Sequence, residues 1–301
     1  MSTVISTKNL TRRYRSTAVL NDLDLNVPEA SVFGFVGPNG AGKTTTIKIL
    51  MNIIQPSAGS AEVLGRDTRK LSPADLTRIG YVSENQELPE WMTVEYFLAY
   101  LKPFYPDWDD SRAAELLRMF DLPRERRLSE LSRGMRMKAA LVSALAYRPR
   151  LLVLDEPFSG LDPLVREDLI EGLLESASET TIFISSHDLA DIESFASHIG
   201  YLDRGRLHFS EDMTSLSARF REIEVTVEPP APDCPLPEWP TSWLRPQTSN
   251  ALVRFVETRF EPEHTTAEIR RLFGNVRYIS VNPMSLRAIF ITLARNVSRT
   301  A

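Results

Sequence analysis

The sequence has little or nothing of several features, and each shortage excludes a class of protein. It has one cysteine, Cys234, so the chain can form no internal disulfide. No apolar run approaches the roughly 20 residues that a membrane-spanning helix needs, and Met1 to Leu10 lack the apolar core of a signal peptide. The formal net charge of −5 provides no basic field to attract nucleic acid. We therefore expect a protein of the reducing cytosol, with no nucleic-acid partner, that reaches a membrane only through another chain.

The remaining composition is that of an ordinary globular protein. Hydrophobic residues make up 43% and charged residues 25% of the 301 positions. This length suits one large domain or two modest ones, each able to bury a core.

A glycine-rich loop, GPNGAGKTT at residues 37–45, is the strongest motif in the chain. It fits the pattern G-x-x-x-x-G-K-[ST] and stands between an apolar run, residues 32–36, and a helix-like stretch, residues 45–51. A plain glycine-rich turn before a helix would look similar but would not require the lysine and threonine. Glycines let several backbone N–H groups point at one phosphate, and the following helix adds its positive end. The predicted nucleotide-binding residues of this loop are Gly37, Asn39, Gly40, Gly42, Lys43, Thr44 and Thr45.

Lys43 and Thr44 have separate expected roles in that loop. Lys43 supplies a full positive charge to the β and γ phosphates, and the Thr44 hydroxyl suits a Mg²⁺ ligand.

Charged and polar residues follow two buried strands further along the chain. The apolar run LLVL, residues 151–154, ends in Asp155 and Glu156, and a strand at residues 181–185 ends at His187. Ligands of open α/β sheets collect at the carboxyl ends of strands. Two adjacent acids there can divide the work, one on a metal and one on a water. The alternative is a strand-end turn with solvated acids and a structural histidine.

Two weaker signals lie on either side. Tyr14, upstream of the loop, could stack on an adenine ring or pack in the core as a strand aromatic. LSRGM, residues 131–135, opens a helix that is expected to reach about Tyr147, with Ser132 as its N-cap. Gly134 leaves its first turn open to close approach, so the exposed N–H groups could bind an anion, although a plain capped helix would look the same.

The sequence pattern changes between residues 88 and 122, where strand patterns stop and a helical insertion is expected. Thr93, and Asp110 or Ser111, look like N-caps. The insertion's aromatic residues either fill its own small core or form a socket for a helix of another protein. They are Trp91, Tyr96, Phe97, Tyr100, Phe104, Tyr105 and Trp108.

The composition shifts again after about Ser210. Seven of the 20 prolines fall between Pro229 and Pro246, which predicts a linker. Strand, helix, strand and helix patterns follow it, without a chemistry-bearing motif.

Taken together, five elements in one order resemble the ATP-binding subunit of an ABC (ATP-binding cassette) transporter. GPNGAGKTT resembles the family's phosphate loop (Walker A), LSRGM its signature motif, LLVLDEP its Walker B strand, SGLD at residues 159–162 the following turn, and His187 its switch histidine. The match covers roughly residues 1–210. The tail SLRAIFITL resembles an appendage found on exporter-type cassettes that pair with a separate permease.

The resemblance implies a fold and a division of the chain. The expected fold is α/β, a P-loop NTPase cassette with a mixed sheet core, an antiparallel β subdomain and a helical subdomain, followed by a small α+β domain. The ATPase domain would span residues 1–215, with the insertion at about 88–147. An accessory or regulatory domain would span 216–301 and contain the proline-rich linker 229–246.

It also implies roles. Glu156 would polarise the attacking water, His187 would contact the γ-phosphate, and Lys43 would steady the transferring group. Tyr14 falls where the family places its adenine-stacking aromatic. Thr44, Asp155 and Glu84 would hold Mg²⁺.

Two copies of the chain, or this chain and a paralogous cassette, would face head to tail around two ATP molecules. Ser132 and Gly134 of one would then close the nucleotide site of the other. The insertion would dock on a permease at the inner face of the plasma membrane, for export rather than import.

Two of the motifs depart from the family pattern, at three positions. Glu84 stands where the family usually has glutamine, so its role as a metal ligand is a weaker expectation than that of Asp155. In the signature motif, Arg133 and Met135 replace the commoner glycine and glutamine.

Two other functions are open on the sequence. One is a soluble cassette ATPase acting on nucleic acid or ribosomes, but the chain has no sustained heptad stretch and no second phosphate loop. The other is a non-hydrolysing regulator that senses nucleotide, against which Asp155, Glu156 and His187 argue.

Overall fold

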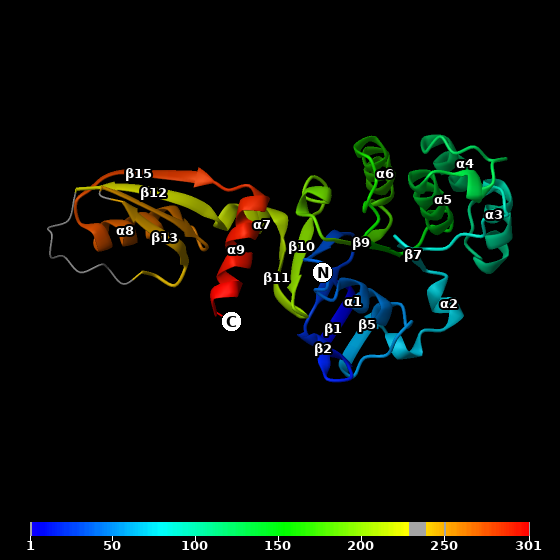
Figure 1. Cartoon of the computed structure of the whole chain (residues 1–301), viewed down its shortest axis with the longest axis horizontal. Coiled ribbons are helices and arrows are strands. Elements are labelled where there is room, and N and C mark those ends of the chain that lie inside the picture. Colours follow the sequence, from blue (N-terminus) through cyan, green and yellow to red (C-terminus); the bar gives the residue numbers. More distant parts are fainter. Residues whose placement is uncertain (1, 229–238, 250, 301) are drawn as a thin grey trace. The chain divides into compact units, whose positions relative to one another are not determined.

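The computed structural model describes residues 2–228, 239–249 and 251–300, the last seven of these as backbone only. Cys234 and most of the expected proline-rich linker lie outside the described residues. By contacts, the chain divides into two compact units, Met1–Glu211 and Asp212–Ala301 (Figure 1). Among the described residues, no helix combines the length and the apolar character needed to cross a membrane.

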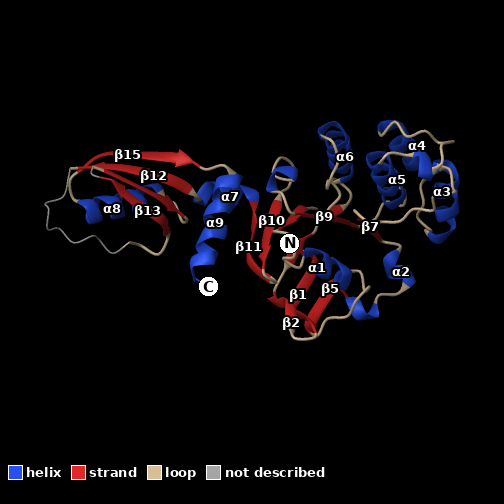
Figure 2. Cartoon of the chain, viewed as in Figure 1, coloured by secondary structure: helices blue, strands red, loops and turns tan. Residues whose placement is uncertain are grey.

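A six-stranded sheet forms the centre of the first unit (Figure 2). Its strands run in the order β11-β10-β4-β9-β8-β7, and the pairs from β10 to β7 are parallel. Every residue of β4 and β8 is buried, as expected for strands covered on both faces. The strands are β4 (Val32–Val36), β7 (Ile79–Ser83), β8 (Leu151–Asp155), β9 (Thr181–Ser186), β10 (His198–Asp203) and β11 (Arg206–Asp212).

The parallel register brings the carboxyl ends of these strands to one edge. Val36 of β4 pairs with Ser186 of β9, and Asp155 of β8 pairs with both Ser185 and Ser83. The phosphate loop follows β4, so the sheet delivers it beside the two acids and the histidine.

An antiparallel sheet makes the second layer of this unit, in the order β2-β1-β5-β6 with β3 also on β1. The aliphatic residues of the first strand, β1, stop at Leu10, but the strand itself is longer. The strand continues to Tyr14 because register shifts between Leu10, Arg12 and Arg13 let it keep pairing with its neighbour. The strands are β1 (Thr3–Tyr14), β2 (Thr17–Leu23), β3 (Asn26–Pro28), β5 (Ala58–Val63) and β6 (Arg66–Asp67).

The helices of the first unit include a group built around α5, which α3, α4 and α6 contact. The α-helices are α1 (Lys43–Leu50), α2 (Pro73–Leu76), α3 (Val94–Leu101), α4 (Asp110–Met119), α5 (Arg133–Leu145) and α6 (Pro163–Ser176). Short 3-10 segments are η1 (Thr68–Lys70), η2 (Lys102–Phe104), η3 (Leu128–Glu130) and η4 (Leu189–Asp191).

Capping residues were predicted well, with one exception. Thr93 and Ser132 accept hydrogen bonds from the first turns of α3 and α5, as expected, and Asp162 of the SGLD turn does the same for α6. The cap of α4 is Asp109, not Asp110 or Ser111. Three acidic or hydroxyl residues in a row can all cap a helix, and the position of the chain decides which one does.

The aromatic residues of the insertion do not all fill its core. Phe97 is buried and Tyr105 and Trp108 are half-buried, whereas the other four of the seven expose half or more of their surface. A purely core interpretation is therefore wrong for these four, which are Trp91, Tyr96, Tyr100 and Phe104.

The second unit is an antiparallel sheet in the order β13-β14-β12-β15 with helices and a core of its own. Trp243 stacks on Phe255 with ring centroids 3.8 Å apart, and Ile223 and Ile269 pack in the same cluster. The expected linker does not reach Pro246, because β13 already begins at Trp243. The elements are α7 (Met213–Arg219), β12 (Arg221–Val227), β13 (Trp243–Ser249), β14 (Leu252–Glu257), α8 (Pro262–Phe273), β15 (Val276–Pro283) and α9 (Leu286–Thr300).

Candidate functional site

The phosphate loop turns tightly between β4 and α1. Gly40 and Gly42 have φ of 81° and 113°, in the left-handed region that favours glycine. A Cβ on Gly42 would also lie 2.6 Å from the Leu20 side chain, and one on Gly37 would overlap the Leu202 carbonyl. Gly42 caps α1 without a side-chain hydrogen bond, so no side chain covers the first N–H groups of that helix. This is the geometry of an anion site at a helix N-terminus.

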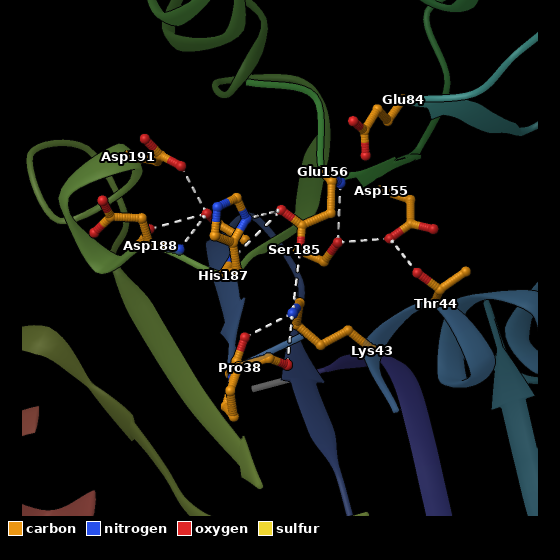
Figure 3. A network of polar contacts seen from close by, with 12 residues as sticks. Pro38, Lys43, Thr44, Glu84, Asp155, Glu156, Ser185, His187, Asp188 and Asp191 are labelled. Carbon is orange, nitrogen blue, oxygen red and sulfur yellow. Dashed lines mark hydrogen bonds and ion pairs between the residues drawn. The ribbon is translucent and has the colours of Figure 1, made fainter. Parts of the chain in front are cut away.

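Lys43, the first residue of α1, is buried and points back into the loop. Its Nζ donates to the carbonyls of Gly37 at 2.6 Å and Pro38 at 3.2 Å. It also forms an ion pair with Glu156 Oε1 at 3.1 Å (Figure 3). The sequence predicted Lys43 as a phosphate ligand but gave no sign of this direct contact with the acid.

Glu156 links the lysine to the histidine. Its backbone is left-handed, with φ of 53°, and its N–H donates to Ser185 Oγ at 3.0 Å. The other carboxylate oxygen, Oε2, lies 2.8 Å from His187 Nδ1 and accepts from the His187 N–H at 3.2 Å. A non-glycine residue in this conformation stores strain of about 1–3 kcal/mol, and such residues cluster at functional sites. Lys43, Glu156 and His187 therefore form one polar chain beside the phosphate loop.

Asp155 points the other way, toward Thr44. Its Oδ1 accepts from Thr44 Oγ1 at 3.2 Å and from Ser185 Oγ at 2.7 Å. Burial raises the pKa of the Asp155 carboxyl above its usual range, and the two hydroxyl bonds partly oppose that rise.

The donor set around Asp155 fits a hard cation. Mg²⁺ takes oxygen ligands, commonly one or two carboxylates beside waters and substrate phosphates. The Thr44 hydroxyl and the buried Asp155 carboxylate meet that description, and a cation there would offset the buried negative charge. Glu84, at the end of β7, is bound to Asp155 only through the backbone, its N–H donating to the Asp155 carbonyl at 2.9 Å. Its carboxylate instead accepts from Arg133 Nη2 at 2.6 Å.

Ser185 is the functional residue that sequence reasoning missed. It binds the Asp155 carboxylate and the Glu156 backbone at once, and so fixes both acids. A hydroxyl pair, Ser185 and Ser186, ending an otherwise apolar strand was the available signal.

Three other predicted residues lie outside this network. Tyr14 is 45% exposed at the end of β1, which contradicts core packing, and the Arg12 guanidinium lies over one face of its ring at 4.5 Å. Ser132 is exposed at the start of α5, where its Oγ caps the Met135 N–H at 3.2 Å. Gly134 is buried against Val165 of α6. Within the described residues, no contact joins Ser132 or Gly134 to Lys43.

Comparison with known proteins finds one family, both by a family model and by individual relatives. A model of the family "ABC transporter" matches residues 20–159. The bacitracin transport ATP-binding protein BcrA of Bacillus licheniformis is 35% identical over 211 residues, which is 69% of each chain. The daunorubicin/doxorubicin resistance ATP-binding protein DrrA of Streptomyces peucetius is 30% identical and covers 96% of this chain and 92% of its own length.

Solved structures show the same fold. An ATP-binding subunit of an ABC transporter superposes with a TM-score of 0.66 at 28% identity, over 71% of this chain and 92% of that one. A dimeric ATP-binding cassette in a post-hydrolysis state, bound to ADP and Pi, superposes with a TM-score of 0.63 at 24% identity. It covers 69% of this chain and 98% of that one.

Proposed function

The chain belongs to the ABC transporter family as an ATP-binding subunit that hydrolyses ATP, and from this premise we propose how its residues bind and hydrolyse the nucleotide. The single observation that carries the proposal is the polar chain of Lys43, Glu156 and His187 beside the phosphate loop. In this proposal the γ-phosphate and its attacking water meet beside this cation, carboxylate and imidazole.

The phosphate loop and Tyr14 bind the nucleotide in this proposal. The N–H groups of the loop, including those of Asn39 and Thr45, cradle the phosphates, and Lys43 adds its charge. ATP phosphates would compete with Glu156 for the Lys43 ammonium, because its three N–H donors already face the Gly37 and Pro38 carbonyls and Glu156. Tyr14, exposed on β1, offers a ring face for the adenine.

Glu156 and His187 carry out the hydrolysis step in this proposal. Glu156 accepts a proton from the attacking water, and its strained backbone and two hydrogen bonds to His187 hold its carboxylate in place. His187 contacts the γ-phosphate, and Lys43 steadies the negative charge of the transferring group.

Thr44 and Asp155, with Glu84 as a third residue, would hold Mg²⁺. Mg²⁺ held by these residues would supply positive charge that offsets the negative charge of the phosphates.

Replacing Glu156 by glutamine tests the mechanism. The amide keeps the shape of the side chain but is a far weaker base, so turnover should fall at least about 100-fold while ATP binding is retained. Phosphate release and equilibrium binding of labelled ATP measure the two effects. Glu167→Gln, an exposed position on α6, is the matched control and should change neither. Unchanged turnover in Glu156→Gln would remove Glu156 from the mechanism.

Two copies of the chain, or one copy and a paralogous cassette, act together. Ser132 and Gly134 at the start of α5 would close the nucleotide site of the partner. The exposure of Ser132 at the start of α5 supports that role. ATP would then hold the two chains together, and hydrolysis would release them.

The membrane partner would dock on the helical insertion. We define the aromatic surface as Trp91, Tyr96, Tyr100 and Phe104. Trp91 lies 5.8 Å from Tyr96, and Tyr100 lies 5.7 Å from Phe104, measured between ring centroids. Exposed aromatic pairs of this kind are typical anchors of protein interfaces.

A groove of about 310 Å³ is a second feature of this docking region. Its lining joins the core sheet and the insertion, and includes Met51, Tyr81, Leu88, Phe97, Tyr105 and Tyr147. A groove of mixed polar and apolar lining between the core sheet and the insertion suits a short amphipathic helix of a permease. The chain would thereby sit peripherally on the cytoplasmic face of the plasma membrane. Export is the favoured direction, since relatives are named for antibiotic transport and drug resistance.

Substitution of the aromatic surface tests the docking proposal. Trp91→Ser with Phe104→Ser should lower recovery of the chain with a membrane protein in mild detergent about tenfold, because interface anchors commonly contribute more than 1.4 kcal/mol. ATP binding by the purified variant should not change. Leu164→Ser with Ile53→Ser, also exposed apolar positions, is the control. Equal losses in both variants would argue against this surface.

A further inference from the structure

Two of the three positions that depart from the family pattern, Glu84 and Arg133, are in contact with each other. Arg133 Nη2 donates to Glu84 Oε1 at 2.6 Å, although the residues belong to separate elements. Glu84 follows β7 and is tied through its backbone to Asp155. Arg133 is the first residue of α5, directly after Ser132. One ion pair therefore connects the metal-binding edge of the sheet to the helix start that would serve the partner's nucleotide.

The Arg133 side chain also lies against a third segment. A Cβ on Gly160 would be 2.9 Å from Arg133 Nη1, so the guanidinium occupies the space that a side chain there would fill. Gly160 belongs to the turn that leads to Asp162 and α6. Arg133 thus lies between the end of β7 and this turn.

The pair has room to separate. Beside it is a cavity of about 710 Å³, lined among others by Glu84, Gln86, Arg133 and Met137. Both partners are partly exposed, with 28% of the Glu84 and 50% of the Arg133 side chain accessible. Exposed ion pairs contribute little to stability, so this pair can break without unfolding its surroundings.

We propose that Arg133 is a positioning residue that holds the Glu84 carboxylate away from the Thr44 and Asp155 site, and that Mg²⁺-nucleotide binding and this ion pair exclude each other. The inference rests on the proposed function. A carboxylate neutralised by a guanidinium is a poorer ligand for a second cation. Binding at one nucleotide site therefore frees Arg133 at the start of α5, beside the Ser132 that serves the other site.

The opposite charges of Glu84 and Arg133 are both absent from the usual family pattern. With glutamine at position 84 and glycine at position 133, the residues usual in the family, neither charge would be present. Here each single replacement leaves one charge without its partner, and replacing both removes the interaction. A double-mutant cycle on these two positions isolates it.

The experiment measures binding of a fluorescent, non-hydrolysable ATP analogue to the intact chain as Mg²⁺ is raised. Arg133→Ala, and Arg133→Met which keeps part of the aliphatic stem, should lower the half-maximal Mg²⁺ concentration about fivefold or more. In the Glu84→Gln background, the same Arg133 replacements should have no further effect. Arg133→Lys, which keeps the charge, should keep the wild-type value.

Arg136→Ala is the matched control, since Arg136 lies one turn along α5, lines the same cavity and pairs with Glu90 instead. It should leave the Mg²⁺ dependence unchanged. An Arg133 effect that persists in the Glu84→Gln background, or that is absent when Glu84 is present, would overturn the proposal while leaving the proposed function intact. Nucleotide binding without any Mg²⁺ dependence in the wild type would overturn both. Thermal unfolding of each variant confirms that it is folded.

Discussion

At the scale of single residues, the negative charge of the Asp155 carboxylate is buried, and hydrogen bonds from its neighbours only partly replace the lost hydration. Its side chain is buried, its carboxylate is bound by two hydroxyls, and Glu156 follows it directly. Burial raises its pKa because the charged form loses water that the hydroxyls do not fully replace. A buried carboxylate of this kind lowers the stability of the fold and attracts a cation.

Asp155→Asn should therefore stabilise the fold while weakening function. The amide oxygen can still accept from Thr44 and Ser185, and the buried charge is removed, so the melting temperature at neutral pH should rise by about 2–4 °C, as expected for roughly 1 kcal/mol in a domain of this size. The Mg²⁺ dependence of nucleotide binding should be lost. Differential scanning calorimetry and a nucleotide titration measure the two effects.

Asp107→Asn, at an exposed position, is the control for that substitution and should leave the melting temperature unchanged. A lower melting temperature for Asp155→Asn would mean that the ionised carboxylate is needed by the fold itself.

At the scale of elements, the packing of α5 on α6 decides where the signature motif lies. Gly134 is the second residue of α5, and a Cβ there would be 2.7 Å from Val165 Cγ1. The sequence left open what approaches this glycine. The structure shows that, within one chain, it is the neighbouring helix α6.

Gly134→Val should push the start of α5 away from α6. Overpacking of this kind destabilises by about 1–3 kcal/mol. Adding Val165→Ala should recover most of the loss by giving the new side chain room, whereas Val165→Ala alone should have a smaller effect. Chemical denaturation of the three variants measures these differences. An equal loss with and without Val165→Ala would show that the helix contact is not the cause.

Helices and strands could be predicted from the sequence where their signals are local. The buried, mainly apolar strands β4 and β8 and the capped starts of α5 and α6 are local signals, so the sequence alone located them. The continuation of β1 to Tyr14 and the choice of Asp109 as a cap depend on pairing and packing with distant segments, which local patterns do not contain.

At the scale of the whole molecule, the chain has two separate cores. One includes Phe33, Phe35 and Phe183, and the other includes Trp243, Phe255 and Ile269. The described residues of the second unit carry no part of the polar network around Lys43. We expected a boundary near residue 215, and assignment of an accessory or regulatory role to the second unit stays a prediction.

Phe255→Ala should destabilise the second unit by about 3–5 kcal/mol, because it removes a fully buried ring that stacks on Trp243. ATP binding should remain at the wild-type level. Scanning calorimetry should show one melting transition shifted and another unchanged. Phe183→Ala, in the other core, should shift the opposite transition and weaken ATP binding; a common shift in both variants would indicate a single cooperative unit.

The sequence by itself determined the phosphate loop, the acids after β8, the capped start of α5 and the family to which the chain belongs. These features depend on short stretches in which glycine conformation, strand hydrophobicity and helix capping act within a few residues. Only the tertiary structure decided which side chains meet: Ser185 with Asp155 across 30 positions, and Arg133 with Glu84 across 49. Such contacts arise from sheet register and helix packing, which are set by the burial of many residues together and by no local pattern.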